Sequence, residues 1–474
     1  MDGSIPCRFE IGPNPAQISL AVKLGYRSNF ILVFQRKARN ILMKLISHLN
    51  LNRVLVFLFI CAASMFYWQN IDTVPFHPDE ATQIYMSADV NHFLSDPLSL
   101  SWTPQNANKP ESRLRLLDAP LTRYSIGLLL KISNLPPLSV DWNWTETWQQ
   151  NQSRGALPST KALHTARIAV AWVFPLSLLM LYAIAARLMD ERTAWLSLFL
   201  FTGNALILLH TRRAMAESLL VFTILVNLFL LVFLKPKHLY FLGITTALAV
   251  CAKQSTAVLI PLNFLAVMWF AYAQEHSVKN SIFYASAFLG LFTLVFFALD
   301  PVFWLYPLQS AQEAIFARRL LLESQVAVIQ SQNPEQILST FPLRIANLIA
   351  HGFFTSPMIA ESRNYLQATR AAELAYFAEP LHTLFRSVLF GAINLILTLT
   401  GSILALLKTI RDPQTREKRT AWMLAAGLFI ILGLVWMVPL PWQRYVIPLV
   451  PLNCLFAAWP FQGLIQRRKS TSIQ

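Results

Sequence analysis

Residues 281–299 read SIFYASAFLGLFTLVFFAL and include no charged side chain. A helix of this length crosses about 30 Å of hydrocarbon and satisfies its backbone polar groups internally. Comparable apolar runs recur along the chain, and the predicted spans are 54–69, 165–187, 194–210, 217–234, 239–252, 255–273, 281–299, 384–407, 420–440 and 445–463. The sequence therefore predicts an all-α polytopic membrane protein, a bundle of about ten transmembrane helices.

The composition of the 474-residue chain supports a membrane protein over a soluble one. Hydrophobic residues make up 55% of the chain and charged residues 13%, whereas charged residues are about 25% of an average soluble protein. The four cysteines are scattered, with no CxxC pair. We therefore interpret them as small packing residues and not as a disulfide framework or a metal site.

The net charge of +15 has two readings. In a soluble protein it would suggest nucleic-acid binding, but here much of the charge lies in short segments between apolar runs, as membrane topology requires. The chain has no zinc-finger spacing and no aromatic and basic RNA-binding signature. We therefore exclude nucleic acid as a partner.

The placement of basic residues predicts the orientation of the chain. An even number of crossings puts both termini on one side, and basic residues follow the second, fourth, eighth and last spans on that side. They are Arg187, Arg192, Lys235, Lys237, Lys408, Arg411, Arg416, Lys418, Arg419, Arg467, Arg468 and Lys469. Because Lys and Arg concentrate in cytoplasmic loops, we expect a cytoplasmic N-terminal extension at 1–53, a membrane domain at 54–463 and a cytoplasmic tail at 464–474.

Two long loops, about 70–164 and 300–383, then face outward. Within the first, residues 120–136 are apolar but contain Arg123 and Lys131, so we expect a helix that lies on the membrane surface. Counting this segment as a crossing would reverse every later loop and break the charge pattern. The second loop contains two periodic stretches, 311–328 and 337–349, which predict short helices resting on the membrane.

The most informative polar string is FHPDE at 76–80, just after the first span. It opens a predicted helix at 79–93, with a proline beside the first helical position. Adjacent acids at a helix N-terminus are stabilised by the helix dipole, so simple capping is one reading of Asp79 and Glu80. The functional reading is that carboxylates at the outer membrane surface reach both a lipid headgroup and an aqueous acceptor.

A second string, HTRRAMAE at 210–217, lies between two spans and faces outward. Arg212 and Arg213 run against the positive-inside trend, and we expect them to hold an anionic headgroup or a pyrophosphate-like group. Glu217 enters the membrane at the start of a helix, where an ionisable side chain is a functional candidate. The structural alternative is a local pair between Arg213 and Glu217, four residues apart.

Two further cations lie on the same expected face. Lys253, in the string CAKQ at 251–254, could bind phosphate as a point charge or extend to the interface as a lysine often does. Arg444, in PWQRY at 441–445, could bind phosphate through paired donors or anchor an aromatic belt.

Taken together, acids and cations on one membrane face suit glycosyl transfer from a lipid-linked sugar phosphate. A carboxylate takes the proton from an acceptor hydroxyl, which attacks the anomeric carbon. The leaving group is already a phosphate, so it needs cations to stabilise it and not a general acid.

The order of these motifs resembles the GT-C membrane glycosyltransferases, specifically the superfamily of protein O-mannosyltransferases and lipid A aminoarabinose transferases. The resemblance covers about residues 50–465 and is carried by the Asp-Glu pair at 79–80, the acid at 217, the lysine at 253 and the Arg-Tyr pair at 444–445 followed by Pro448. It implies a GT-C-like bundle and an enzyme that inverts the anomeric carbon.

The resemblance also implies roles for individual residues. Asp79 is the expected catalytic base, and Glu80 and Glu217 are expected to orient the acceptor or a metal. The expected donor-phosphate contacts are Arg212, Arg213, Lys253 and Arg444, and the expected acceptor or sugar contacts are His77 and Tyr445. No cofactor is implied, and a divalent metal is left open.

Three positions depart from the family pattern. The family often has Lys-Pro-Pro-Leu where this chain has Asp118-Ala119-Pro120-Leu121, so a phosphate-binding lysine is absent there. The acid at 217 is a glutamate where aspartate is commoner, and the turn at Lys253 lacks its glycine. The string HPDE at 77–80, with Gln83 after it, also resembles the GPI-type mannosyltransferases, a related branch.

The expected partners are a polyprenyl- or dolichyl-phosphate-linked sugar donor, a protein, lipid or glycan acceptor, and membrane lipids. A transporter or flippase of lipid-linked sugars is the alternative from another class, but it predicts charges deep within several spans. A non-catalytic membrane scaffold is a third. We expect the bacterial plasma membrane as the location, or the endoplasmic reticulum if the chain is eukaryotic.

Overall fold

The computed structural model describes residues 51–360, 363–411, 415–437 and 439–462. The chain divides into two units, 1–59 and 60–474. Of the first unit only 51–59 are described, as the beginning of helix α2 (Leu51–Gln69), so most of the predicted cytoplasmic extension and almost all of the tail lie outside the described residues. All regular structure in the described residues is helical, which confirms the predicted all-α class.

Six helical segments in the described part of the chain are long and apolar enough to cross a membrane. They are α2, α8 (Thr160–Ala171) with α9 (Phe174–Leu188), η3 (Gln254–Val258) with α14 (Leu259–Glu275), α15 (Val278–Leu299), α19 (Val388–Arg411) and α20 (Thr415–Met437). Each coincides with a predicted span. They confirm a polytopic helical membrane protein.

The remaining four predicted spans are occupied by shorter helices. These are α10 (Glu191–Thr202) with α11 (Ala205–His210), α12 (Glu217–Phe233), η2 (Pro236–Phe241) with α13 (Leu242–Ala252), and η8 (Gln443–Leu449) with α21 (Val450–Ala458) and η9 (Trp459–Phe461). The span predicted at 194–210 is broken at Gly203 and Asn204, because the Asn204 side chain accepts the amides of Leu206 and Ile207 and starts a new helix. A total of ten crossings stays a prediction.

The long helices pack closely where glycine removes a side chain. A Cβ at Gly243 of α13 would collide with the backbone of Phe288 in α15, and one at Gly401 of α19 would collide with Phe456 in α21. A buried polar cluster adds to the packing of α12 with α13 and α14: Asn227 Nδ2 donates to Thr245 at 2.9 Å, and Asn263 donates to Asn227 at 3.0 Å. Small residues and shared hydrogen bonds are the usual contacts between membrane helices.

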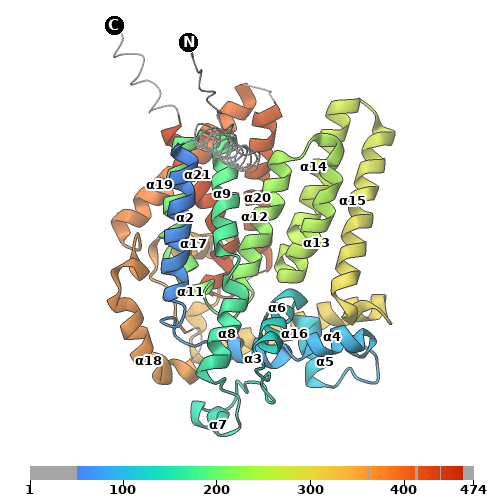
Figure 1. Ribbon diagram of the computed structural model, residues 1–474, viewed down its shortest axis with the longest axis vertical. Helices are drawn as coiled ribbons and strands as arrows, with labels where there is room; N and C mark the ends of the chain where they lie inside the picture. The colour runs from blue at the N-terminus through green and yellow to red at the C-terminus, as the bar shows by residue number, and fades with distance from the viewer. Residues whose placement is uncertain (1–50, 361–362, 412–414, 438, 463–474) are drawn as a thin grey trace, which may run out of the picture. The chain divides into compact units, whose positions relative to one another are not determined.

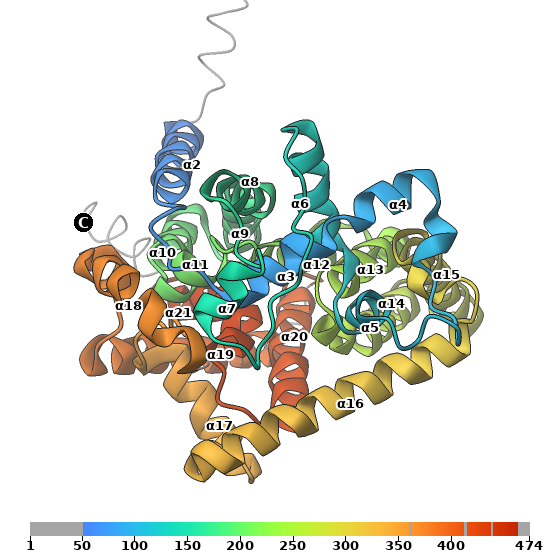
Figure 2. The same ribbon diagram turned by 90° about the horizontal axis from the view of Figure 1, so that it is seen from below.

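A layer of short helical segments and one long helix, α16 (Pro307–Gln332), lies at one end of α12, α13 and α15 (Figures 1 and 2). We call it the site layer. It comprises α3 (Pro78–Met86), α4 (Asp89–Ser95), η1 (Pro97–Leu100), α5 (Pro110–Leu117), α6 (Pro120–Ile132), α7 (Trp148–Ser153), η4 (Pro301–Phe303) and α16 (Pro307–Gln332). The short helix predicted at 311–328 is wrong in its length, because α16 has 26 residues. The second loop continues with η5 (Pro334–Gln336), α17 (Phe341–Ile349), η6 (Ala350–Phe354), α18 (Arg363–Ala378) and η7 (Pro380–Thr383).

One charged residue of the predicted surface helix, Arg123, bonds within this layer. Helix α6 is too short to cross a membrane and packs against α3, α4 and α8. Its Arg123 is buried, with Nε 3.1 Å from a carboxylate oxygen of Asp89 and Nη1 donating to the carbonyl of Asp118 at 2.8 Å. The arginine therefore joins two segments of the layer.

The helix predicted at 79–93 is two helices, α3 and α4, with a break at Ser87 and Ala88. The Ser87 hydroxyl bonds back to the carbonyl of Ile84 at 2.6 Å, which competes with helix continuation. Gly127 of α6 lies so close to the Ser87 carbonyl that any side chain there would collide with it. The break is thus fixed by a close approach of α6, a contact made by residues distant in sequence.

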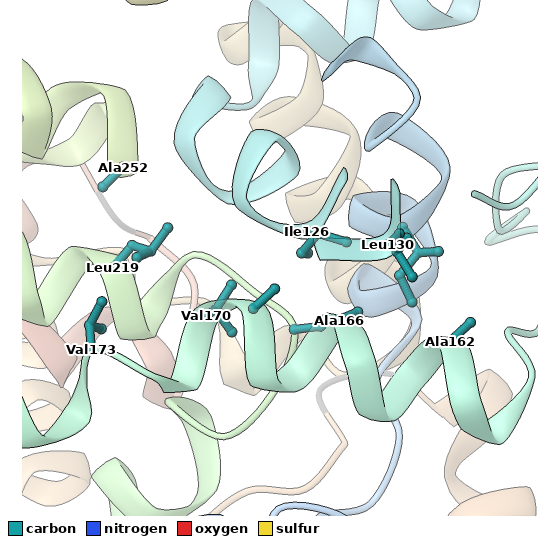
Figure 3. Close-up of a cluster of buried hydrophobic side chains, with 11 residues drawn as sticks. Ile126, Leu130, Ala162, Ala166, Val170, Val173, Leu219 and Ala252 are labelled. Carbon is teal, nitrogen blue, oxygen red and sulfur yellow. The ribbon is translucent and has the colours of Figure 1, made fainter. Parts of the chain in front are cut away.

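A hydrophobic cluster holds the site layer on the bundle (Figure 3). It joins Ile84 of α3, the Ile126 and Leu130 side chains of α6, Leu219 of α12, and the α8 face that carries Ala162, Ala166 and Val170. Each large aliphatic side chain buried in this way contributes roughly 1.5–3 kcal/mol. The cluster fixes the N-termini of α3 and α12 close together, and both begin at predicted acids.

Candidate functional site

The N-terminus of α3 carries Asp79 and Glu80 on a capped first turn. His77 is the N-cap, and its Nδ1 accepts the Asp79 amide at 3.1 Å, while Pro78 occupies the first helical position. Burial, and then the charges of Arg213 and Arg444, hold the pKa of His77 well below its usual value. A neutral imidazole has the free lone pair that this cap requires.

Glu80 is wholly buried and fully bonded. Arg167 of α8 donates to both carboxylate oxygens, at 2.8 and 2.9 Å. The amides of His77 and Ala214 each donate to it at 2.9 Å. Two oxygens have about four lone-pair sites, so these contacts occupy the carboxylate. We call this arrangement the Glu80 clamp, because it ties α3 to α8 and to the segment before α12.

Asp79 has a different environment from its neighbour. Its side chain is 29% exposed, and Arg444 Nη1 donates to its Oδ2. His77 Nδ1 lies 3.8 Å from the same oxygen. Arg444 is 15% exposed, and its guanidinium lies over the Trp442 ring, 5.0 Å from the centroid. The predicted base and a predicted phosphate ligand are therefore in contact, although they are far apart in the sequence.

Glu217 opens α12 and pairs with Lys253, which follows the last turn of α13. Lys253 Nζ donates to Glu217 Oε1 at 2.6 Å. The glutamate side chain is buried, whereas the lysine is 24% exposed. Arg213, the local partner considered from the sequence, instead donates to the carbonyl of Ile359 at 2.7 Å and lies 3.3 Å from that of Pro75.

Arg444 connects the two acids. It pairs with Asp79, and its charge also lies within electrostatic range of Glu217. His210 also lies within electrostatic range of both Glu217 and His77. The structure therefore brings together His77, Asp79, Glu217, Lys253 and Arg444, and Arg213 lies within electrostatic range of His77. The phosphate contact predicted for Arg213 stays a prediction.

Arg212 is not part of this group. Its guanidinium lies 4.9 Å from the ring centroid of Tyr67, and its Nη1 lies 3.1 Å from His382 Nε2. Tyr445 stacks on Trp442 with centroids 5.6 Å apart. The phosphate contact predicted for Arg212 and the acceptor contact predicted for Tyr445 stay predictions.

Two charged residues of this region, Asp118 and Arg318, were not predicted as site residues from the sequence. Asp118 lies near Asp79, Arg318 and Arg444, and burial raises the pKa of its carboxyl. Arg318, from α16, donates to the carbonyl of Leu117 and lies 3.3 Å from Gln254 Oε1. The string RR at 318–319 breaks the positive-inside trend in the second outer loop, and that signal could have identified Arg318.

Asp141 completes the polar surroundings of α3. Thr82 Oγ1, one turn after Asp79, donates to Asp141 Oδ1 at 2.7 Å. Burial raises the pKa of Asp141, and the negative charges of Asp118 and Asp79 act in the same direction. Among the described residues, no group of three or more His, Cys, Asp or Glu side chains is arranged to hold a metal ion.

Comparison with known proteins gives structural matches alone. No family model and no curated protein sequence matches the chain. Three crystal structures of the Archaeoglobus fulgidus oligosaccharyltransferase do. The complex with Zn and sulfate is 13% identical with a TM-score of 0.46, and the match covers 86% of this chain and 49% of that one.

The other two structures give similar values. The form tethered to an acceptor peptide with the NVT sequon is 12% identical, covers 87% and 50% of the two chains, and has a TM-score of 0.47. The apo form is 12% identical, covers 88% and 52%, and has a TM-score of 0.46. The chain spans about half the length of these structures.

Proposed function

We propose that this protein transfers a sugar from a polyprenyl- or dolichyl-phosphate donor to an acceptor hydroxyl, with inversion at the anomeric carbon. The observation that carries the proposal is the partly exposed carboxylate of Asp79. It is held by Arg444 in a cluster that also contains Glu217 and Lys253. A base that is open to substrate and surrounded by cations suits a reaction with an anionic leaving group.

In the proposed step, Asp79 accepts the proton of the acceptor hydroxyl. The hydroxyl oxygen forms a bond to the anomeric carbon from the face opposite the phosphate, and the bond from that carbon to the phosphate oxygen breaks. The electron pair of the broken bond leaves with the lipid phosphate. The reaction needs no oxidant or reductant, and the proton on Asp79 returns to water.

The leaving phosphate is stabilised by the cations around Asp79. Arg444 offers paired donors and Lys253 a point charge. Arg318 adds a third cation, from the side of Asp118. Arg212 and Arg213 are buried and bonded to other groups, so in this proposal they support the fold around the site. Glu80 likewise positions α3, while Glu217 orients Lys253.

The proposal is tested by sugar transfer in membranes that contain the full chain. Radiolabelled polyprenyl- and dolichyl-phosphate sugars are supplied to the wild type, to Asp79→Asn and to Asp72→Asn. Asp72 is an exposed carboxylate that pairs with His164 at 2.7 Å, so it is a matched control. General-base catalysis contributes about 10²–10⁴-fold, and we expect a loss of that size in Asp79→Asn alone. Equal transfer by all three proteins would exclude Asp79 from the mechanism.

The proposed reaction takes place on the outer or lumenal face of the membrane. A cysteine at the exposed position Thr145, in a chain without its native cysteines, tests this orientation. An impermeant thiol reagent is expected to label sealed cells from outside. Labelling from the cytoplasmic side alone would reverse the proposed topology.

A further inference from the structure

A cleft of about 470 Å³ lies in the site layer beside α3. Its walls are the segment 139–144, which follows α6, together with Tyr85, Pro110 and Arg154. Ligand sites for small molecules are about 300–1,000 Å³. The cleft is therefore large enough for a small polar ligand.

The cleft adjoins Asp79 through two chains of contacts. Asp141, in its wall, accepts a hydrogen bond from Thr82, which lies one turn along α3 from Asp79. The Trp144 ring lies 6.3 Å from that of His77, whose Nδ1 is 3.8 Å from the Asp79 carboxylate. The cleft is thus connected to the proposed base through Thr82 on one side and His77 on the other, although Asp79 itself is not part of its wall.

Trp144 gives the cleft an open aromatic surface. Its side chain is 44% exposed, although its ring rests against His77 and lies 6.2 Å from Tyr365. Trp142 forms a buried part of the wall, and its indole Nε1 has no hydrogen-bond partner among the described residues. A fixed aromatic face beside polar groups is suited to the C–H face of a sugar ring, whose hydroxyls point outward around it.

Two polar groups of the cleft suit hydroxyls. The Asp141 carboxylate is an acceptor and the Arg154 guanidinium is a donor, whereas the Asn143 side chain is already bonded to Thr145 and Glu146. The segment is also held in place by the buried side chain of Asn151. It accepts a hydrogen bond from the backbone N–H of Asn143 at 2.8 Å and donates one to the backbone carbonyl of Asn143 at 2.9 Å. A wall that is ordered before binding loses little entropy when a ligand arrives.

We propose that this cleft binds a sugar unit of a glycan acceptor, stacked on Trp144. The inference deepens the proposed function and rests on it, since it names the acceptor class. A peptide acceptor is the alternative, and the binding experiment below separates the two.

Binding is tested with the purified full chain in lipid nanodiscs, without donor. The probes are a panel of soluble oligosaccharides and a panel of Ser- and Thr-containing peptides. We expect a saccharide to bind the wild type, and Trp144→Ala to weaken it about tenfold. Trp144→Phe is expected to restore most of the affinity. Trp172, 52% exposed at the end of α8, gives the matched control Trp172→Ala, which is expected to bind as the wild type does.

Donor turnover separates this inference from the proposed function. Release of lipid phosphate to water is measured without acceptor in the wild type and in the control Trp172→Ala, and the two are expected to be equal. Three outcomes overturn the inference: peptides bind in place of saccharides, no saccharide binds, or Trp144→Ala binds saccharide as the wild type does. In each case donor turnover by the wild type still supports the proposed function. A wild type that turns over no donor overturns the proposed function, and saccharide binding is still measured independently.

Discussion

The two acids at the start of α3 are neighbours in the sequence but have opposite environments. Glu80 lies on the closed side of the turn, with no exposed surface and bonds from Arg167 and two backbone amides. Asp79 lies on the open side, partly exposed and paired with Arg444. Consecutive helical residues point about 100° apart, so one turn of helix supplies both a structural clamp and a partly exposed carboxylate.

The largest expected effect on stability comes from breaking the Glu80 clamp. Arg167→Ala leaves the Glu80 carboxylate buried without its cation, and breaking a buried pair in this way costs about 3–5 kcal/mol. We therefore expect a large loss of thermal stability in nanodiscs, measured as the midpoint of unfolding. Arg154→Ala, which removes an exposed pair with Glu146, is the control and is expected to change stability by about 1 kcal/mol or less. Equal effects of the two variants would show that the clamp does not stabilise the fold.

The pair between Glu217 and Lys253 tests an intermediate case, with a buried acid and a partly exposed lysine. Lys253→Ala is expected to lower transfer about 10²-fold and also to lower stability, because Glu217 loses its partner. The double variant Lys253→Ala with Glu217→Gln is expected to recover stability but not transfer. Recovery of transfer in the double variant would mean that Lys253 acts on the fold alone.

A smaller effect on sugar transfer is expected at Arg318 of α16. Removing a cation that stabilises a leaving phosphate from a partly solvated position is expected to slow transfer about tenfold in Arg318→Ala. The adjacent Arg319 pairs with Glu323 at 2.7 Å on the exposed face of α16, so Arg319→Ala is the matched control. If both variants slow transfer to the same extent, Arg318 has no specific role.

Asp300 is a second buried carboxyl, and it can be compared with Glu80 because, among the described residues, it lacks an arginine that donates to both of its oxygens. Burial raises its pKa to about 7, from a usual value near 3.9, even though Arg123 opposes the shift. Between these two pH values the Asp300 carboxyl is protonated in the folded state but ionised in the unfolded state. The free energy of unfolding therefore falls as pH rises through that range. Asp300→Asn removes this dependence.

The measurement for Asp300 is thermal unfolding from pH 4 to pH 8. We expect Asp300→Asn to be more stable than the wild type at pH 8, with a difference that shrinks toward pH 4. A difference that grows toward pH 4 would contradict the assigned direction of the shift.

Much of the fold could be predicted from the sequence because lipid imposes a simple rule. Apolar runs such as 281–299 become long helices, and the charges at 123 and 131 mark α6 as a helix outside the membrane spans. The break of 79–93 into α3 and α4 could not be predicted, since it depends on the close approach of Gly127. The same is true of α18, which has no apolar periodicity that the sequence reading recognised.

The candidate site was predictable in its residue types but not in its geometry. The motif order identified Asp79, Glu217, Lys253 and Arg444, and these lie in one cluster. The sequence could not tell which of two adjacent acids is enclosed, because that depends on Arg167, more than eighty residues away. Nor did it identify Arg318, which reaches the site from a separate loop.

The central claim is that the chemistry belongs to Asp79 and the architecture to Glu80. The most direct test measures sugar transfer and thermal stability together, in Asp79→Asn and Glu80→Gln, with transfer expressed per folded molecule. The claim predicts that Asp79→Asn keeps its stability and loses transfer, whereas Glu80→Gln loses stability and retains transfer in the molecules that remain folded. Full transfer by Asp79→Asn, or a stable but inactive Glu80→Gln, would contradict it.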